Sequence, residues 1–258
     1  MAGVVAIGES PYPTARAACP LYWTTRDGPE TPMITLHHLE NSRSQRILWL
    51  LEELGVEYEI ERYQRDPVTS LAPQALKDIH PLGKSPVITD GDVTVAASGA
   101  IIDYLVENYD DTGRLQPDPD DAQGLRDYRY FMHYAEGTVM PLLIVALLMR
   151  RVDEAKMPFF VKPIAKGITG KIRSGYLDPN LGNNLAFMES ELTRKPWFAG
   201  NRFTAADIQM SFIAEGLNVS VDLASQFPKL AAFLAKCHAT PTYQRALERG
   251  GPFQLGAR

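Results

Sequence analysis

A short polar turn, Asn41-Ser42-Arg43-Ser44-Gln45-Arg46, stands between an apolar run and an amphipathic segment. Such a turn at the start of a helix presents free backbone N–H groups and the positive end of the helix dipole, and both stabilise an anion. A serine hydroxyl in the turn can donate a hydrogen bond to that anion, and a thiolate is one anion that such a site activates. The spacing of Ser42 and Gln45 also fits a capping box, which would make the serine purely structural.

The composition describes an ordinary globular protein. The 258 residues are 45% hydrophobic and 22% charged, with a formal net charge of −5, so bulk charge favours neither nucleic acid nor an anionic membrane as partner. The two cysteines, Cys19 and Cys237, form no metal-spaced cluster and no disulfide framework, which predicts a reducing, cytoplasmic setting. The five histidines show no ligand spacing, and the most apolar segment, Met140 to Met149, is too short to cross a membrane. We therefore expect neither a metal nor a membrane partner.

The chain opens with a segment unlike the rest. Residues 1–32 contain several prolines and no sustained hydrophobic period, so we predict a poorly structured extension. Met33 begins the first well-patterned strand, which makes a misassigned start one hypothesis for the extension.

Residues 33–109 predict a compact α/β module. A strand precedes the polar turn, a helix with an apolar face follows it, and Gly55 ends that helix. The next elements are a strand over 56–61, a short helix over 73–79, two strands over 86–89 and 93–96, and a helix over 98–108. The Asp90-Gly91 dipeptide between the paired strands predicts a type I′ turn. The order is β-α-β-α-β-β-α, with the first two strands parallel.

A second, helical module follows. Residues 110–120 are acidic and rich in turn formers, which predicts a linker, and residues 121–258 predict an all-helical bundle. The first long helix, from Asp121 to Glu154, is expected to be interrupted near Gly137 or Pro141. Residues 156–180 are expected to form a loop or short helices. Thr204-Ala205-Ala206-Asp207 has the spacing of a capping box.

Four segments in this order resemble the glutathione S-transferase family, over Met33 to about Arg249. They are the turn at Ser42 to Arg46 with the helix after it, His80-Pro81-Leu82-Gly83-Lys84-Ser85-Pro86, Ser98-Gly99-Ala100-Ile101-Ile102-Asp103-Tyr104-Leu105, and Phe203-Thr204-Ala205-Ala206-Asp207-Ile208. The closest likeness is to bacterial and fungal members with a serine-type site. The resemblance implies a thioredoxin-like α/β domain followed by an all-α helical domain, with glutathione as co-substrate.

The resemblance also implies roles for particular residues. Ser42 is the residue expected to donate to the glutathione thiolate, with Ser44 and Asn41 as alternatives. Ser85, before a cis Pro86, would pair through its backbone with the cysteinyl part of glutathione. Ser98 would hold the γ-glutamyl carboxylate, and Lys84 could pair with the glycyl carboxylate. The thiol pKa would fall from its free value of roughly 8.5–9, giving more thiolate at neutral pH.

The sequence departs from the family at Ala97. Relatives usually carry Glu or Gln immediately before the serine that opens this helix, so a side-chain contact to the γ-glutamyl group is missing here. Losing one charged hydrogen bond weakens binding by roughly 1.5–3 kcal/mol. Water or another side chain could replace the contact, or the protein could use glutathione poorly.

The implied function is a glutathione transferase acting on electrophilic small molecules, with hydroperoxide reduction as a further activity. The electrophile pocket is expected on the first long helix of the second domain, at Tyr128, Met132 and His133. The alternatives are a glutathione-dependent pathway enzyme, such as an isomerase or lyase, and a non-catalytic binding protein of the same fold. The family is usually dimeric, so we expect a homodimer.

Overall fold

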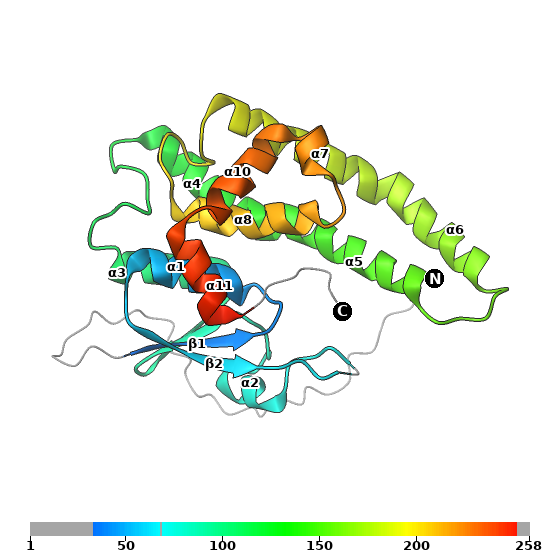
Figure 1. The fold of residues 1–258 in the computed structure, drawn as a ribbon, viewed down its shortest axis with the longest axis horizontal. Helices are drawn as coiled ribbons and strands as arrows, with labels where there is room; N and C mark the ends of the chain where they lie inside the picture. Colours follow the sequence, from blue (N-terminus) through cyan, green and yellow to red (C-terminus); the bar gives the residue numbers. More distant parts are fainter. Residues whose placement is uncertain (1–32, 68, 252–258) are drawn as a thin grey trace, which may run out of the picture. The chain divides into compact units, whose positions relative to one another are not determined.

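The computed structural model describes residues 33–67 and 69–251, and Figure 1 shows their arrangement. The predicted extension over residues 1–32 lies outside the described residues, as do residues 252–258.

A four-stranded mixed sheet forms the first part of the described chain, in the order β2-β1-β3-β4. β1 (Ile34–Leu39) pairs in parallel with β2 (Tyr58–Tyr63), and on its other side it pairs antiparallel with β3 (Val87–Asp90), which pairs antiparallel with β4 (Val93–Ala96). The helices are α1 (Ser44–Leu54), α2 (Gln74–Ile79) and α3 (Ser98–Tyr109). This thioredoxin-like β-α-β-α-β-β-α order, with a parallel first pair, confirms the sequence prediction.

Buried apolar side chains lie on both faces of the sheet. On the side of α1 and α3, Leu36 and Ile88 belong to the main hydrophobic core. On the side of α2, Leu39, Tyr63 and Leu76 form a small separate cluster. Gly55 ends α1 with a φ of 68°, where its N–H bonds to the Leu51 carbonyl. A left-handed residue at this position is a common helix end, as the sequence predicted.

The turn between β3 and β4 differs from the type I′ prediction. Asp90 pairs with Val93, so the central residues are Gly91 and Asp92 rather than Asp90 and Gly91. Gly91 has a φ of 57°, and Asp92 is not among the non-glycine residues with positive φ in the described chain. A positive φ at the first central position alone is the glycine position of a type II′ turn. The hairpin prediction holds, but the turn type was wrong.

The second part of the described chain is helical. Its first long run comprises α4 (Ala122–Tyr134), a π-helical segment η1 (Ala135–Val139) and α5 (Met140–Glu154). The second comprises α6 (Lys162–Ile172), a π-helical segment η2 (Arg173–Leu177) and α7 (Asp178–Arg194). The remaining helices are α8 (Ala205–Asn218), α9 (Leu223–Gln226), α10 (Pro228–His238) and α11 (Pro241–Gly250).

The two long runs correct one prediction and refine another. The interruption expected near Gly137 is a π-helical segment within a continuous 33-residue helix. Residues 156–161 carry no helix, but from Lys162 the chain enters one long helical run in place of the loop or short helices expected over 156–180. Pro163 lies in the first turn of α6, where the missing N–H of proline costs little. Pro179 follows η2 within the same helical run. By length and composition alone the run Ala122–Glu154 could cross a membrane, although part of it packs inside the protein against α8 and α6.

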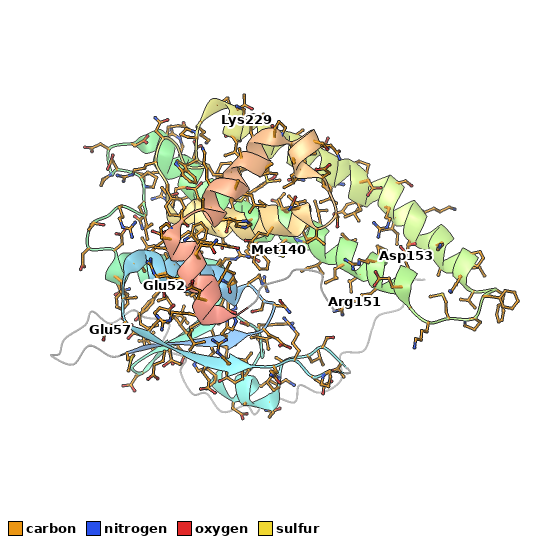
Figure 2. All side chains as sticks on the ribbon, in the orientation of Figure 1. Glu52, Glu57, Met140, Arg151, Asp153 and Lys229 are labelled. Atoms are coloured by element: carbon orange, nitrogen blue, oxygen red, sulfur yellow. The ribbon has the colours of Figure 1, made fainter. Side chains whose placement is uncertain are left out.

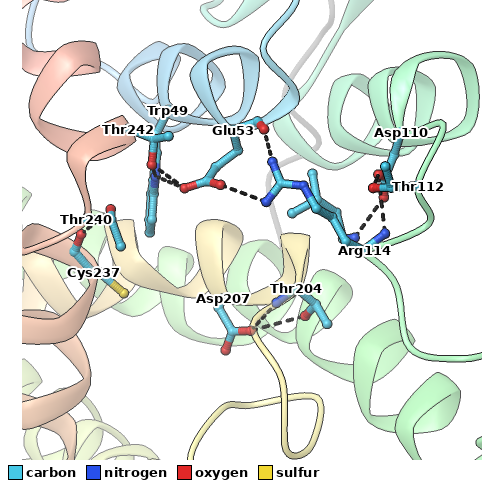
Figure 3. A network of polar contacts seen from close by, with 11 residues as sticks. Trp49, Glu53, Asp110, Thr112, Arg114, Thr204, Asp207, Cys237, Thr240 and Thr242 are labelled. Carbon is cyan, nitrogen blue, oxygen red and sulfur yellow. Dashed lines mark hydrogen bonds and ion pairs between the residues drawn. The ribbon is translucent and has the colours of Figure 1, made fainter.

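The last helix, α11, packs against α1 of the sheet part. Trp49 meets Tyr243 edge to face at 5.2 Å, and its indole N–H lies 3.1 Å from Thr242 Oγ1 and from Glu53 Oε1. Figure 3 shows this cluster, in which Arg114 also bonds to Glu53. Glu52, labelled in Figure 2, pairs with Arg245 at 2.8 Å and with Arg249 at 3.2 Å. Glu52 and Glu53 of α1 therefore both bind side chains of α11, since Thr242 also donates to Glu53.

The segment between α3 and α4 carries no helix or strand, and side chains hold it in place. The Asp110 carboxylate accepts from the backbone N–H groups of Arg114 and Leu115, and the Leu115 carbonyl accepts from Ala205 N at 2.8 Å. The start of α8 is thereby bonded to the predicted linker.

Thr204 and Asp207 form the capping box that the sequence predicted. The Asp207 carboxylate accepts from Thr204 N at 2.8 Å (Figure 3). It also accepts from Phe198 N at 2.8 Å. Burial raises the pKa of this carboxyl to about 7. Asp207 is fully enclosed, so its role is to fix the loop and the start of α8.

Candidate functional site

A cleft of about 900 Å³ lies between the sheet part and the first long helix. It is lined by the end of β4 and the start of α3, by the loop before β3, and by α4 and η1. The lining residues are Arg43, His80, Leu82, Lys84, Ser85, Pro86, Ala96, Ala97, Ser98, Gly99, Ala100, Asp103, Met132, His133, Glu136, Gly137 and Gln209. The glutathione-contact residues predicted at Lys84, Ser85, Pro86, Ala97 and Ser98 therefore share one cavity.

Three serine hydroxyls meet beside this cleft. Ser42 Oγ lies 2.7 Å from Ser44 Oγ and 3.1 Å from Ser85 Oγ. All three residues are buried, and only Ser85 of the three lines the cleft. Asn41, the other alternative at the turn, has a φ of 47° and is exposed. The fold thus joins both serines of the turn to the loop before β3.

The capping box predicted from Ser42 and Gln45 is wrong. α1 begins at Ser44 with Arg43 in the capping position, and no side chain caps it. Ser42 Oγ accepts a long bond from Ser44 N at 3.3 Å, and within the described part of the chain the buried side-chain amide nitrogen of Gln45 has no hydrogen-bond partner. Ser42 is free of the capping role because the helix starts one residue later than the capping box requires.

A buried histidine continues the serine cluster into the protein. His38 Nδ1 lies 2.8 Å from Ser44 Oγ. Burial, followed by the positive charge of Arg62, lowers the pKa of His38 to about 4, against a smaller opposite effect of the Gly250 backbone. His38 is therefore neutral at neutral pH.

The peptide bond between Ser85 and Pro86 is cis, as the resemblance implied. Pro86 precedes β3, and both Ser85 and Pro86 are buried while lining the cleft. Lys84 beside them is exposed, so its ammonium group is available to an anion at the mouth of the cleft.

Ser98 opens α3 with an unused hydroxyl. The residue is 4% exposed, and its Oγ is buried without a hydrogen-bond partner among the described residues. Ala97 before it has φ 77° and ψ 134°, a conformation that non-glycine residues rarely adopt and that is often found at functional sites. A helix N-terminus with an unpartnered hydroxyl is well suited to bind a carboxylate.

The predicted electrophile pocket is only partly placed at the cleft. Met132 and His133 line it, whereas Tyr128 belongs to the hydrophobic core. Tyr128 lies on the same face of α4 as Met132 but one turn earlier, where the side chain packs in the hydrophobic core instead of lining the cavity. Burial raises the pKa of Tyr128 well above the usual range for tyrosine, which makes it a poor acid or nucleophile.

Charged residues from distant segments complete the lining. Glu136 Oε2 accepts from Arg43 at 2.6 Å, and Arg46 Nη1 lies 2.9 Å from Glu136 Oε1. Gln209 of α8 accepts from Arg46 at 2.6 Å. Gln209 was not predicted to be part of the site, because no local pattern marks a residue that reaches a cleft through tertiary packing. No cluster of three or more potential metal ligands occurs in residues 33–67 and 69–251.

Comparisons of this chain with family models and with known proteins all identify the same family. Residues 31–107 match the family described as "Glutathione S-transferase, N-terminal domain", and residues 154–241 match "Glutathione S-transferase, C-terminal domain". Glutathione S-transferase 3 of Schizosaccharomyces pombe is 40% identical, over 70% of this chain and 72% of its own length. Glutathione S-transferase 1 of Saccharomyces cerevisiae is 34% identical, over 70% and 79% respectively.

Solved structures show the same fold. A glutathione S-transferase from Actinobacillus pleuropneumoniae is 32% identical and superposes with a TM-score of 0.66, over 84% of this chain and 93% of its own. A glutathione transferase homologue from Lodderomyces elongisporus, solved with two glutathione molecules per subunit, has a TM-score of 0.67 at 19% identity, over 84% and 98%.

Proposed function

The chain belongs to the glutathione S-transferase family, and we propose that it binds glutathione in this cleft and transfers the thiol to electrophilic small molecules. The observation that carries the proposal is the unpartnered Ser98 hydroxyl at the N-terminus of α3. A buried hydroxyl without a partner is costly unless a ligand supplies one. The γ-glutamyl carboxylate of glutathione supplies such a partner.

Other residues that line the cleft supply the remaining contacts proposed for glutathione. The backbone of Ser85, held by the cis bond to Pro86, faces the position proposed for the cysteinyl residue. Lys84 is available to the glycyl carboxylate. The acidic side chains of Asp103 and Glu136 line the same cleft and give it negative charge, in addition to the cations of Arg43 and Lys84. A zwitterionic tripeptide fits a cavity that carries both signs of charge.

In the proposed reaction, the thiol loses its proton and Ser42 stabilises the resulting thiolate by hydrogen bonding. The thiolate sulfur attacks the electrophilic carbon, a carbon–sulfur bond forms, and the leaving group departs with its electron pair. No bond to the protein is made. Met132 and His133, on the opposite wall, are the proposed contacts of the electrophile. A generic hydroperoxide is a second substrate to test, because the same thiolate can attack oxygen.

We propose further that the protein is a cytoplasmic homodimer. Large apolar side chains are exposed along α5, at Ile144, Leu147 and Leu148, and an unpaired apolar stripe supports association with a second copy. Cys237, the one cysteine among the described residues, is buried with a free thiol, in keeping with a reducing setting. Light scattering after size-exclusion chromatography tests the dimer, and a monomer at micromolar concentration would contradict it. Fluorescence microscopy of a tagged full-length chain tests the location.

Calorimetric titration with glutathione, followed by assay with a generic aryl halide, tests the function. Ser98→Ala should weaken glutathione binding by about tenfold, because it removes a hydrogen bond to a charged group. Ser42→Ala should leave binding near wild type but raise the pKa of the bound thiol. Ser190→Ala, at an exposed serine of α7 remote from the cleft, is the matched control. Absence of binding at millimolar glutathione would overturn the proposal.

A further inference from the structure

Two carboxylates line the cleft, and one of them is already paired. Glu136 accepts from Arg43 at 2.6 Å through Oε2, and its Oε1 lies 2.9 Å from Arg46 Nη1. Asp103 lines the same cleft, and within the described part of the chain it makes no hydrogen bond or ion pair. The carboxylate of Asp103 is therefore available to a cation in the cleft.

Asp103 lies on the face of α3 that is turned toward the cleft. Gly99 and Asp103, four residues apart, both line the cleft and so share one face of the helix. Asp103 is about 6 Å further along the helix axis than Gly99, because each residue of an α-helix rises about 1.5 Å. Helical side chains lean toward the N-terminus of their helix. The Asp103 carboxylate therefore extends back over the first turn, where Ser98 and Gly99 lie.

Gly99 leaves room in front of this first turn. A Cβ added at Gly99 would lie 3.9 Å from Gln209 Nε2, which is an ordinary contact distance. That nitrogen already donates to the Met132 carbonyl at 3.3 Å. A small polar group of a ligand therefore fits between the hydroxyl of Ser98 and the carboxylate of Asp103.

The γ-glutamyl end of glutathione carries two opposite charges on one carbon atom. The proposed site holds its carboxylate at Ser98 and the N-terminus of α3, which places the neighbouring ammonium group beside the same turn. An ammonium group has three N–H donors, and leaving water without an acceptor costs it free energy. Ala97 offers no side-chain acceptor, and Glu136 is paired with two arginines. Asp103 is the carboxylate that remains.

We propose that Asp103 accepts a hydrogen bond from the γ-glutamyl ammonium group and thereby replaces the acidic contact that is missing at Ala97. This inference rests on the proposed function and concerns the specificity of the same cleft. Ser98 binds the α-carboxylate and Asp103 binds the α-ammonium group, so the site selects thiol peptides that have a free α-amino-acid end. A peptide without the ammonium group brings its carboxylate next to that of Asp103, and the two negative charges repel each other.

The charges around Asp103 are consistent with this role. Partial desolvation raises the pKa of the Asp103 carboxyl, the charge of Glu107 raises it further, and His133 acts in the opposite direction. The raised pKa reflects a negative charge that the protein does not balance. A bound ammonium group supplies that balance, because an adjacent opposite charge favours the ionised carboxylate.

Calorimetric titration of the full-length chain with two peptides tests the inference. One is glutathione, and the other is glutaryl-cysteinylglycine, in which a hydrogen atom replaces the ammonium group. Asp103→Asn should weaken glutathione binding by about five- to tenfold, because a charged hydrogen bond is lost at a partly open site. The same substitution should leave the affinity for glutaryl-cysteinylglycine unchanged or higher, because it removes the repulsion between the two carboxylates.

An equal loss for both peptides, or an unchanged affinity for glutathione, would overturn the role of Asp103 and leave the proposed function in place. Absence of glutathione binding to the wild type would overturn both together. Circular dichroism confirms that the variant is folded.

Glu107→Gln is the matched control, at an exposed position one turn further along α3 and outside the lining of the cleft. It should change the affinity for either peptide by no more than about twofold. If Glu107→Gln weakens glutathione binding as much as Asp103→Asn does, the ammonium group responds to the general negative charge of α3 and the proposed contact is wrong.

Discussion

Arg46 Nη1 lies 2.9 Å from Glu136 Oε1 and thereby joins the buried start of α1 to the π-helical segment that lines the cleft. The Arg46 side chain is 1% exposed, and its guanidinium also lies over the ring of Phe212, 4.4 Å from the centroid. Burial lowers the pKa of Arg46 to about 10, and the charge of Glu136 opposes this shift. Glu136 is thus the main counter-charge of a buried cation.

Glu136→Gln should lower the free energy of unfolding by about 3 kcal/mol, because it leaves a buried guanidinium without its counter-charge. Chemical denaturation at neutral pH measures the effect. The matched control is Glu154→Gln in the exposed pair of Arg150 and Glu154, where a change within about 0.5 kcal/mol is expected. Equal effects of the two substitutions would show that Arg46 does not depend on Glu136.

Ala97→Glu should tighten glutathione binding by about tenfold or more, because it adds a charged hydrogen bond near the γ-glutamyl ammonium group. Position 97 lines the cleft, and glutamate meets no more backbone strain there than the alanine already present. Calorimetry measures the dissociation constant. Ala97→Gln provides a graded control with a smaller expected gain. Weaker binding by Ala97→Glu than by wild type would mean that another side chain already occupies this role.

Acid should destabilise the protein through His38. The pKa of His38 is lowered by burial from 6.5 to about 4, so between these values the unfolded chain binds more protons than the folded one. Its contribution to stability is present above pH 6.5 and is lost as the pH falls through this window, by up to about 3 kcal/mol. His37, whose pKa is also lowered by burial, adds in the same direction.

Urea unfolding from about pH 7.5 to about pH 4.5 measures this loss. His38→Asn should flatten the dependence, because the substituted residue does not titrate. His133→Asn, at an exposed position of α4, is the control and should retain the wild-type slope. If His38→Asn and wild type show the same slope, His38 is not buried in its neutral form.

Gly250→Ala should lower the free energy of unfolding by about 1–3 kcal/mol, the usual cost of overpacking. A Cβ at Gly250 would lie 2.5 Å from Leu48 Cδ1 and 2.8 Å from Gln45 Oε1. Gly170→Ala is the matched control, because a Cβ there meets no atom within 4 Å. Alanine is the better helix former by about 1 kcal/mol, so the control should gain stability. A gain in Gly250→Ala as well would show that α11 is not closely packed on α1.

The sequence predicted the elements that depend on local pattern. The order of strands and helices in the sheet part, Gly55 as a helix end, and the capping box of Thr204 and Asp207 all follow from short-range spacing. The cis peptide before Pro86 was predicted from the family resemblance instead, because nothing in the local sequence distinguishes it from a trans proline.

The features that the sequence did not predict depend on contacts between different segments of the folded chain. The spacing of Ser42 and Gln45 suits a capping box, but the bonds of Ser42 to Ser44 and Ser85 prevail, and the helix begins later. The glycines and prolines over 156–180 suggested a loop or short helices, yet α6 packs along α5 and belongs to a long helical run. Gln209 reaches the site only through contacts with distant segments, such as its bond to Arg46, and no periodicity in the chain marks such a residue.

The packing of α11 on α1 bears on the order in which the protein can be completed during synthesis. Thr242, which bonds to Trp49, is made 193 residues after it, and Tyr243 and Gly250, which also cover α1, follow Thr242. Domains usually fold as units as they emerge, beginning with the N-terminal one. Here the sheet part has an uncovered apolar helix until α11 has been made. α11 therefore completes the packing of the sheet part, and a nascent chain lacking it would leave Trp49 open to chaperones or to aggregation.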